Sequence, residues 1–218
     1  MHTNVNLAAP IGALAFLGTA IILFVTALIL GQSLIVRKTR RARVILIAMV
    51  IVVGAYFGVL FIFSIISHDK LLARGEEKHF CELDCHLAYS IVTSVQQTTF
   101  GEGANQMRAQ GQFAIVTIKT RFDETTTASG RGNGLLYPNG RALVLIDDRG
   151  NRYRPVAETG TPVTTPLRVA DTYTTEVAFD LPAGAKPSVL LLAEDAWETH
   201  LLIGHENSPL HGQTKFQI

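Results

Sequence analysis

Both cysteines of the chain lie close together, in the run Cys81-Glu-Leu-Asp-Cys85, and His86 follows directly. Two thiols separated by three residues can form a disulfide, bind a soft metal ion, attach a haem or take part in thiol–disulfide exchange. These four interpretations give the same residues different chemistry. The spacing leaves all four open.

A structural disulfide between Cys81 and Cys85 is the simplest interpretation. Paired cysteines are typical of oxidising compartments, and the topology derived below predicts such a compartment. A bridge that closes so short a loop constrains the unfolded chain little, so its contribution to stability would be small. The two Cβ atoms would be poorly placed within a helix. We therefore expect the pair at a turn or at the start of a strand.

Copper is the second interpretation, because thiolates and imidazole are the ligands that Cu(I) prefers. The Cys-x3-Cys spacing is similar to that of cytochrome oxidase subunit II, whose copper domain is anchored by a two-helix hairpin with both ends outside, and to that of the Sco copper-delivery proteins. The chain departs from both, because its motif precedes the predicted strands and lacks the following Met, and because no thioredoxin-like helices are predicted. With Cys81, Cys85 and His86, further candidate ligands near the C-terminus are His205, Glu206 and His211.

The third and fourth interpretations are a c-type haem and a thiol-redox site. Covalent haem attachment normally uses Cys-x2-Cys-His, one residue shorter than this motif, and a haem also needs an apolar pocket with a second axial ligand. A redox role would use His86 to activate a thiol. Glu82 and Asp84 would oppose that activation, because neighbouring negative charge disfavours a thiolate.

Two uncharged apolar runs, at about residues 10–35 and 44–66, must position everything that follows them. Each exceeds the ~20 residues that a helix needs to cross a bilayer. Backbone groups in lipid must satisfy one another, which favours helices. The sequence therefore predicts a transmembrane hairpin over residues 1–67, a juxtamembrane linker with the Cys motif over residues 68–86, and a separate domain over residues 87–218.

The charges predict the orientation of this hairpin. Five basic residues and no acidic residue lie in the linker between the runs, at Arg37, Lys38, Arg40, Arg41 and Arg43. Such a loop is expected on the cytoplasmic side. The N-terminus and the C-terminal domain would then lie outside, and because no glycosylation sequon is present we expect a bacterial inner membrane with a periplasmic domain.

The C-terminal domain is predicted to be an all-β antiparallel sandwich. Strand-like runs occur at residues 87–95, 113–122, 142–147, 173–179 and 188–192, and alternation is clearest in the second of them. Turn signals separate them at residues 138–140, 148–151 and 182–184, and residues 125–134 and 157–166 are expected to be loops. Regularly spaced short strands without an amphipathic helix are typical of a sandwich.

Two segments of this domain resemble known proteins. The run 141–153, with its Asp-x-x-Gly hairpin, and the run 176–182, which ends Phe-Asp-Leu-Pro, look like the Ig-like, telokin-type domains of bacterial extracytoplasmic proteins. The run 202–211 and the Cys motif resemble uncharacterised two-span bacterial membrane proteins. These resemblances imply an architecture, and they imply no activity.

The remaining features favour a binding role over catalysis. No hydrolytic triad, phosphate-binding loop or carboxylate pair stands out, so we expect a non-enzymatic protein without a cofactor unless copper or haem c is bound. From Asp69 onward the chain has 14 basic and 18 acidic residues, a net charge of −4, which excludes nucleic acid as a partner. Gly54 and Gly58 predict a close helix contact. We expect an accessory or assembly subunit of a respiratory or photosynthetic membrane complex.

Overall fold

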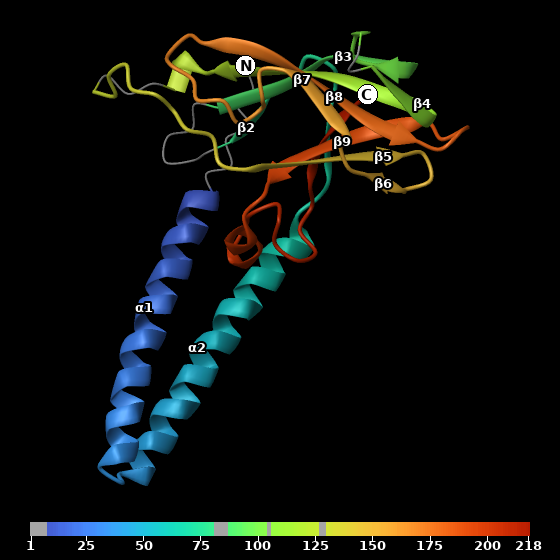
Figure 1. Ribbon diagram of the computed structural model, residues 1–218. Coiled ribbons are helices and arrows are strands. Elements are labelled where there is room, and N and C mark those ends of the chain that lie inside the picture. Colours follow the sequence, from blue (N-terminus) through green and yellow to red (C-terminus); the bar gives the residue numbers. More distant parts are fainter. Residues whose placement is uncertain (1–7, 81–86, 104–105, 127–129) are drawn as a thin grey trace. The chain divides into compact units, whose positions relative to one another are not determined.

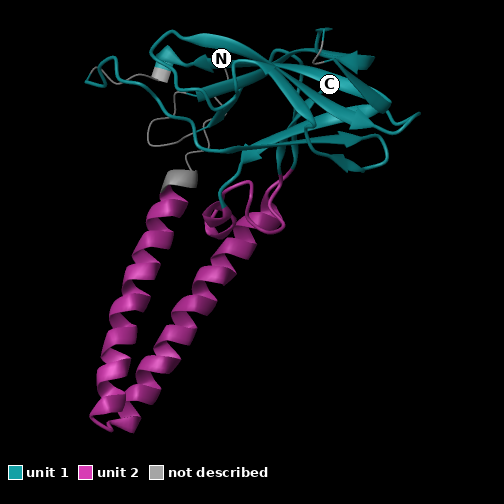
Figure 2. Cartoon of the chain, in the orientation of Figure 1, with its two compact units in different colours: residues 1–6, 69–196, 213–218 teal, residues 7–68, 197–212 magenta. Residues whose placement is uncertain are grey.

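The computed structural model describes residues 8–80, 87–103, 106–126 and 130–218. The chain divides into two compact units, which Figure 2 distinguishes by colour. One contains Asp69–Ala196 and Gln213–Ile218, and the other contains Leu7–His68 and Trp197–Gly212. Each unit is described by itself.

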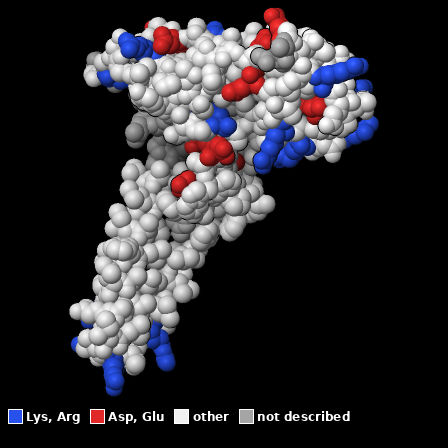
Figure 3. Space-filling model, viewed as in Figure 1, with Lys and Arg blue, Asp and Glu red and all other residues white. Residues whose placement is uncertain are grey.

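The helical unit contains the two predicted apolar helices, α1 (Ala8–Ile35) and α2 (Thr39–Ile66). A tight turn joins them, in which Arg37 has a φ of 57° and the Lys38 amide donates to the Ser33 carbonyl. The five basic residues from which the orientation was predicted lie at this turn and in the first turns of α2. Figure 3 shows their side chains at the tip of an otherwise uncharged pair of helices.

The apolar side chains of both helices face outward. Each helix is long and apolar enough to cross a bilayer, and only 0% and 6% of their most apolar stretches are buried within the chain. A core helix of a soluble protein would bury such a stretch instead. A Cβ atom at Gly54 or Gly58 would meet nothing within 4 Å, so α1 does not contact this pair. A close approach of another helix to Gly54 and Gly58 stays a prediction, and that helix would belong to another chain.

The sandwich unit consists of two five-stranded sheets. In spatial order, the first contains β1 (Lys70–Leu72), β10 (Thr214–Gln217), β9 (Pro187–Glu194), β5 (Arg141–Asp147) and β6 (Arg152–Tyr153). The second contains β2 (Lys78–Phe80), β3 (Leu87–Phe100), β4 (Met107–Phe122), β8 (Thr172–Leu181) and β7 (Ala157–Gly160). All pairs are antiparallel except β1 with β10. The predicted fold class, two apolar helices followed by a β-sandwich, is confirmed.

The five predicted strands correspond to β3, β4, β5, β8 and β9, and the structure adds short strands that the sequence did not reveal. Residues 68–86 were expected to be a linker, yet they contain β1 and β2. Residues 157–166 were expected to be a loop, yet they begin with β7. These strands have two to four residues or lie at sheet edges, where too few side chains are buried to produce an alternating pattern.

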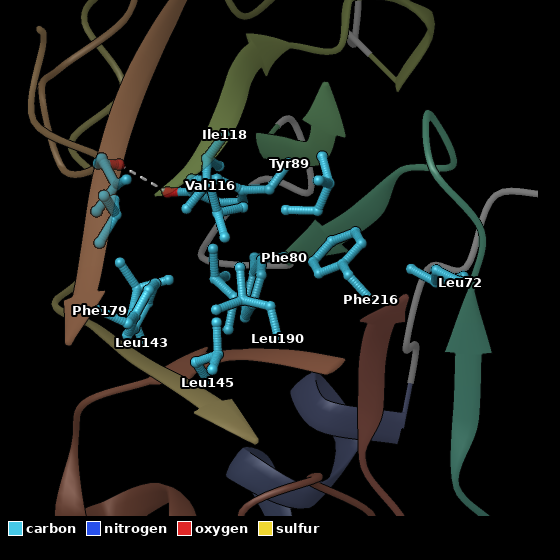
Figure 4. Close-up of a cluster of buried hydrophobic side chains, with 14 of the residues drawn as sticks. Leu72, Phe80, Tyr89, Val116, Ile118, Leu143, Leu145, Phe179, Leu190 and Phe216 are labelled. Atoms are coloured by element: carbon cyan, nitrogen blue, oxygen red, sulfur yellow. Dashed lines mark hydrogen bonds between the residues drawn. The ribbon is translucent and has the colours of Figure 1, made fainter. Parts of the chain in front are cut away.

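The core lies between the two sheets, where inward-facing side chains of both meet. β5 alternates along its length, so that Leu143, Leu145 and Asp147 are buried and the residues between them are not. Figure 4 shows Leu143 and Leu145 facing Phe179 of the other sheet, with Leu190 and Phe216 beside them. This closed core leaves the outer faces of the sheets free for other contacts.

Asp147 is a buried carboxylate that organises the predicted hairpin after β5. It accepts hydrogen bonds from the amides of Arg149 and Asn151, from the Asn151 side chain and from the Tyr153 hydroxyl, all at 2.8–2.9 Å. Burial alone would raise the pKa of Asp147, but these donors lower it to about 2. The group therefore serves the turn and has no acid–base role.

The compact units divide the chain at other places than the predicted ranges 1–67, 68–86 and 87–218. Between β9 and β10, the segment Trp197–Gly212 belongs to the compact unit of the helices instead of the sandwich unit. Its contacts with α1 and α2 cause this assignment, and such contacts between segments distant in sequence leave no local pattern to recognise.

Replacement of Leu145 tests the core. Leu145 is fully buried between the sheets, so Leu145→Ala removes apolar contacts and leaves a cavity. We expect a loss of about 2–5 kcal/mol in the free energy of unfolding, measured by denaturant unfolding in detergent. Leu135→Ala, at a half-exposed leucine of the same unit, is the matched control. Equal losses in the two variants would contradict the described core.

Candidate functional site

The outer face of the β2–β3–β4–β8–β7 sheet carries a groove that four strands line. Strand register aligns Thr93 of β3 with Thr117 of β4, Thr117 with Glu176 of β8, and Glu176 with Thr159 of β7. Side chains directly across neighbouring strands contact one another on a sheet face. The Thr93 hydroxyl indeed donates to the Thr117 hydroxyl at 3.0 Å. The result is a polar row across the sheet.

A second, apolar row runs beside the polar one. The same register aligns Val95 with Ile115, Ile115 with Ala178, and Ala178 with Ala157. Ile115 and Ala178 belong to a small hydrophobic cluster on this face, separate from the main core. The groove has a volume of about 1020 Å³. Neighbouring apolar and polar rows in one groove are typical of a surface that binds another molecule.

The charge of the groove is one-sided. Glu102, Glu158 and Glu176 line it, and among its described lining residues none is Lys or Arg. Glu158 and Glu176 are exposed, so their charges act on an approaching partner. A mildly apolar groove with three carboxylates favours a segment with basic side chains.

A second candidate site is a network of charged side chains beside the connection from β2 to β3. Strand register aligns His79 of β2 with Ala88 of β3, and Ala88 with Arg121 of β4. His79 and Arg121 thus lie on either side of the small residue Ala88, at aligned positions of the sheet. Glu77 and Asp123, next to these strands, complete the network.

The contacts of the network are short. Arg121 donates two hydrogen bonds to the Glu77 carboxylate, at 2.8 and 2.7 Å, which is the strong bidentate arrangement. The Nε2 atom of His79 lies 3.0 Å from Oδ2 of Asp123, and since a carboxylate only accepts, the imidazole is the donor. The His79 side chain is 6% exposed, and its Nδ1 atom has no hydrogen-bond partner within the part of the chain that the structure describes.

The electrostatics of the network favour ionised carboxylates. Hydrogen bonds from Arg121 lower the pKa of Glu77 and outweigh its partial burial. Burial raises the pKa of Asp123, but hydrogen bonds from the Thr125 hydroxyl and amide, together with the charge of Arg121, lower it overall. Asp123 is therefore an anion that orients the imidazole of His79. An imidazole held by a carboxylate, with its other nitrogen unoccupied, is an arrangement found at metal sites and in catalytic dyads.

The residues predicted from the sequence are placed only in part. Cys81, Cys85 and His86 lie outside the described residues, so the disulfide, copper, haem and redox predictions stay predictions. They belong to the connection between Phe80 and Leu87, which are paired residues of β2 and β3. The other three candidate ligands, His205, Glu206 and His211, lie in the helical unit. Within the described parts of the chain, no group of three His, Cys, Asp or Glu side chains is arranged to hold a metal ion.

Sequence reasoning missed His79 and Asp123. The available signal for His79 was its position two residues before Cys81, in a run that alternates in burial as a strand does. Asp123 directly follows a predicted strand, but only the pairing of three strands brings it to His79. That pairing cannot be derived from local pattern.

Two solved structures resemble this chain at low identity. A secreted protein of Mycobacterium tuberculosis, MPT63, is 13% identical, with a TM-score of 0.45, and the match covers 69% of this chain and 98% of that one. An uncharacterized β-sandwich protein of Clostridium difficile 630 is 8% identical, with a TM-score of 0.40, over 70% of this chain and 95% of that one. No protein family matches the sequence, and no curated protein is detectably similar to it.

The Glu77–Arg121 pair predicts a pH dependence of stability. Because the folded-state pKa of Glu77 lies below its ordinary value of 4.5, the pair stabilises the fold fully above that value and progressively less as the pH falls through the folded pKa. Wild type should exceed Glu77→Gln by about 1 kcal/mol at pH 7, since both partners are partly exposed. The difference should shrink below about pH 4.

Unfolding titrations between pH 7 and pH 3 measure this difference. Glu102→Gln, at an exposed carboxylate outside the network, is the control and should show no pH-dependent gap. A gap between wild type and Glu77→Gln that stays constant with pH would contradict the assignment.

Proposed function

We propose that this chain is a membrane-anchored, non-catalytic accessory or assembly subunit, and that its β-sandwich binds a larger membrane complex on the periplasmic side. The groove on the outer face of the sandwich is the observation that carries this proposal. It combines an apolar row, a polar row and three carboxylates on a sheet whose core is already closed. Such a face is free to bind a partner without disturbing the fold.

The helices support the anchoring part of the proposal. Their exposed apolar surface needs lipid or other helices, and the basic residues at the turn between them favour a cytoplasmic position for that turn. Gly54 and Gly58 lie on the surface of α2 with open space beside them, where a helix of a partner can approach closely. The topology would then place the sandwich outside a bacterial inner membrane.

The chemistry of the groove narrows the kind of contact that we expect. Its carboxylates favour an extended, basic segment of a partner, because like charge would repel an acidic one. A respiratory or photosynthetic complex is the client to test first. The basis for that choice is the two-helix topology shared with cytochrome oxidase subunit II, and it is an expectation from sequence.

Charge reversal in the groove tests the proposal. We expect the protein, purified from its native membrane in mild detergent, to carry stoichiometric companion subunits. Glu176→Lys should reduce their recovery by about tenfold, which corresponds to 1.4 kcal/mol of binding free energy. Asp148→Lys reverses an exposed charge in the hairpin after β5 and should leave recovery unchanged. A protein that runs alone in wild-type form would contradict the proposal.

A copper-binding or thiol-redox protein is the second candidate, and His79 is the observation that favours it. Its Nδ1 atom is buried and has no partner among the described residues, and His79 lies two residues before Cys81. A buried polar atom without a partner is costly unless it has a use. A histidine whose other nitrogen donates to a carboxylate is a good metal ligand. Cys81, Cys85 and His86 would supply the remaining ligands, by sequence.

Metal analysis and thiol titration of the full chain distinguish these roles. A copper protein should bind Cu(I) in proportion to protein and lose it in the Cys81→Ser/Cys85→Ser variant. Asp123→Asn should weaken Cu(I) binding about 10–100-fold, because Asp123 holds the imidazole of His79 without being one of the candidate ligands. Asp148→Asn is the matched control. A metal-free protein without free thiols before reduction would contradict the copper role and leave the disulfide interpretation.

A further inference from the structure

The segment between β9 and β10 has a structure of its own within the helical unit. It begins with a 3-10 helix, Trp197–Leu201, and continues as successive tight turns. The amides of Leu202, His205, Ser208 and His211 each donate to the carbonyl three residues earlier. These repeated turns make the segment a compact element, although it has no long helix or strand.

The insertion Trp197–Gly212 packs on both helices at the ends remote from their connecting turn. The hydroxyl of Tyr56 in α2 donates to the Leu201 carbonyl at 2.6 Å, and the Gly212 amide donates to the hydroxyl of Ser67, the residue that ends α2. On α1, Gly12 is buried, and a Cβ atom there would overlap the carbonyl oxygen of Ile203. The insertion therefore contacts α1 and α2 directly. Figure 1 shows the insertion beside the end of α2.

The buried residues in the last turns of α2 lie on the same face of the helix as Tyr56, which contacts the insertion. Leu60 and Ser64 are buried, and with Tyr56 they are spaced four residues apart, so the three lie on one face of the helix. The other faces of these turns stay apolar and exposed, as at Ile62, Ile65 and Ile66. The insertion thus lies at the level of the last turns of an apolar helix.

The insertion exposes two large apolar side chains while it buries several polar ones, although its Glu198 and His200 are exposed. Its polar residues Thr199, His205 and Ser208 are buried, and the Asn207 side chain donates to the Thr199 hydroxyl at 2.8 Å. Two of its large apolar residues face outward, with Trp197 69% exposed and Leu210 73% exposed, whereas its leucines and isoleucine at 201–203 are partly buried. A soluble segment normally buries its tryptophan and leaves serine and histidine outside.

Leu210 strengthens this point through its backbone. Its φ is 65°, in the left-handed region that disfavours side chains other than glycine or asparagine. In water, this backbone conformation costs free energy, and the outward position of the Leu210 side chain gives no free energy in return. It gains if the leucine enters an apolar phase.

From this geometry we infer that Trp197–Gly212 is an interfacial membrane element, and that Trp197 and Leu210 insert into the boundary between headgroups and acyl chains. Tryptophan is enriched at that boundary because its ring is apolar and its indole N–H needs a polar partner. The insertion is continuous with the exposed apolar residues of the helices, including Ile11 and Leu14 of α1. Lipid is therefore the occupant that matches its surroundings. The inference extends the anchoring part of the proposed function and does not depend on any partner subunit.

The single tryptophan of the chain makes the inference directly measurable. The full chain would be reconstituted into phosphatidylcholine vesicles that contain lipids with a spin-label quencher placed near the headgroup or near the acyl-chain end. We expect Trp197 emission to be quenched several-fold more by the shallow lipid label than by the deep one, and several-fold less by aqueous iodide than an exposed reference. Trp197→Phe/Tyr137→Trp supplies that reference, because Tyr137 is an exposed aromatic residue of the sandwich unit.

Leu210→Glu should reduce the lipid quenching of Trp197, because a charge at the second anchor opposes insertion, whereas Leu135→Glu on the sandwich should not. Iodide quenching of Trp197 equal to that of the reference would overturn the inference, since the segment would then face water. Protection of Trp197 from both iodide and lipid quenchers would overturn it as well, because a protein surface would be the occupant. Flotation of the vesicles with bound protein tests the helical anchor separately. A failure of the anchor can therefore be distinguished from a failure of the inference about Trp197–Gly212.

Discussion

The apolar surface of α1 and α2 constrains every other part of the molecule. Each helix has 28 residues, about 42 Å of helix at 1.5 Å per residue, and its apolar side chains find few partners within the chain. Such a surface is stable only against hydrocarbon or other helices. The polar groups of the chain must then lie at the ends of the helices or be satisfied internally, and both the basic turn and the insertion Trp197–Gly212 meet this requirement.

The sandwich buries its apolar side chains between its own two sheets. Its outer faces are therefore available to bind another molecule. Its core closes between the two sheets, with Phe216 and Leu190 on one side and Phe179 on the other. The outer face of the second sheet then carries ordered rows of side chains that no core contact requires. Because β3, β4, β8 and β7 are held in register, these rows form one continuous groove instead of scattered surface residues.

Two groups of buried polar atoms behave differently and thereby separate structure from candidate function. Around Asp147, every contact closes the hairpin, and the low pKa of about 2 reflects complete satisfaction by donors. Around Asp123, the carboxylate instead orients His79, whose Nδ1 atom has no partner in the described ranges. The hydrogen bonds of the first group are fully explained by the structure of the hairpin. The second contains a reactive atom that the fold alone does not explain, which is why it bears on the thiol and metal chemistry predicted for the neighbouring residues.

The helices, the long strands and the hairpin at Asp147 could be predicted from the sequence, because they depend on apolar length, on alternation and on local turn chemistry. The sequence did not reveal the edge strands β1, β2 and β7, which bury too few residues to leave a pattern. Only the tertiary structure aligned Thr117 with Glu176, joined His79 to Asp123, and assigned Trp197–Gly212 to the helices. Each of these depends on pairing between segments far apart in the chain, and the free energy of such pairing is absent from any local window.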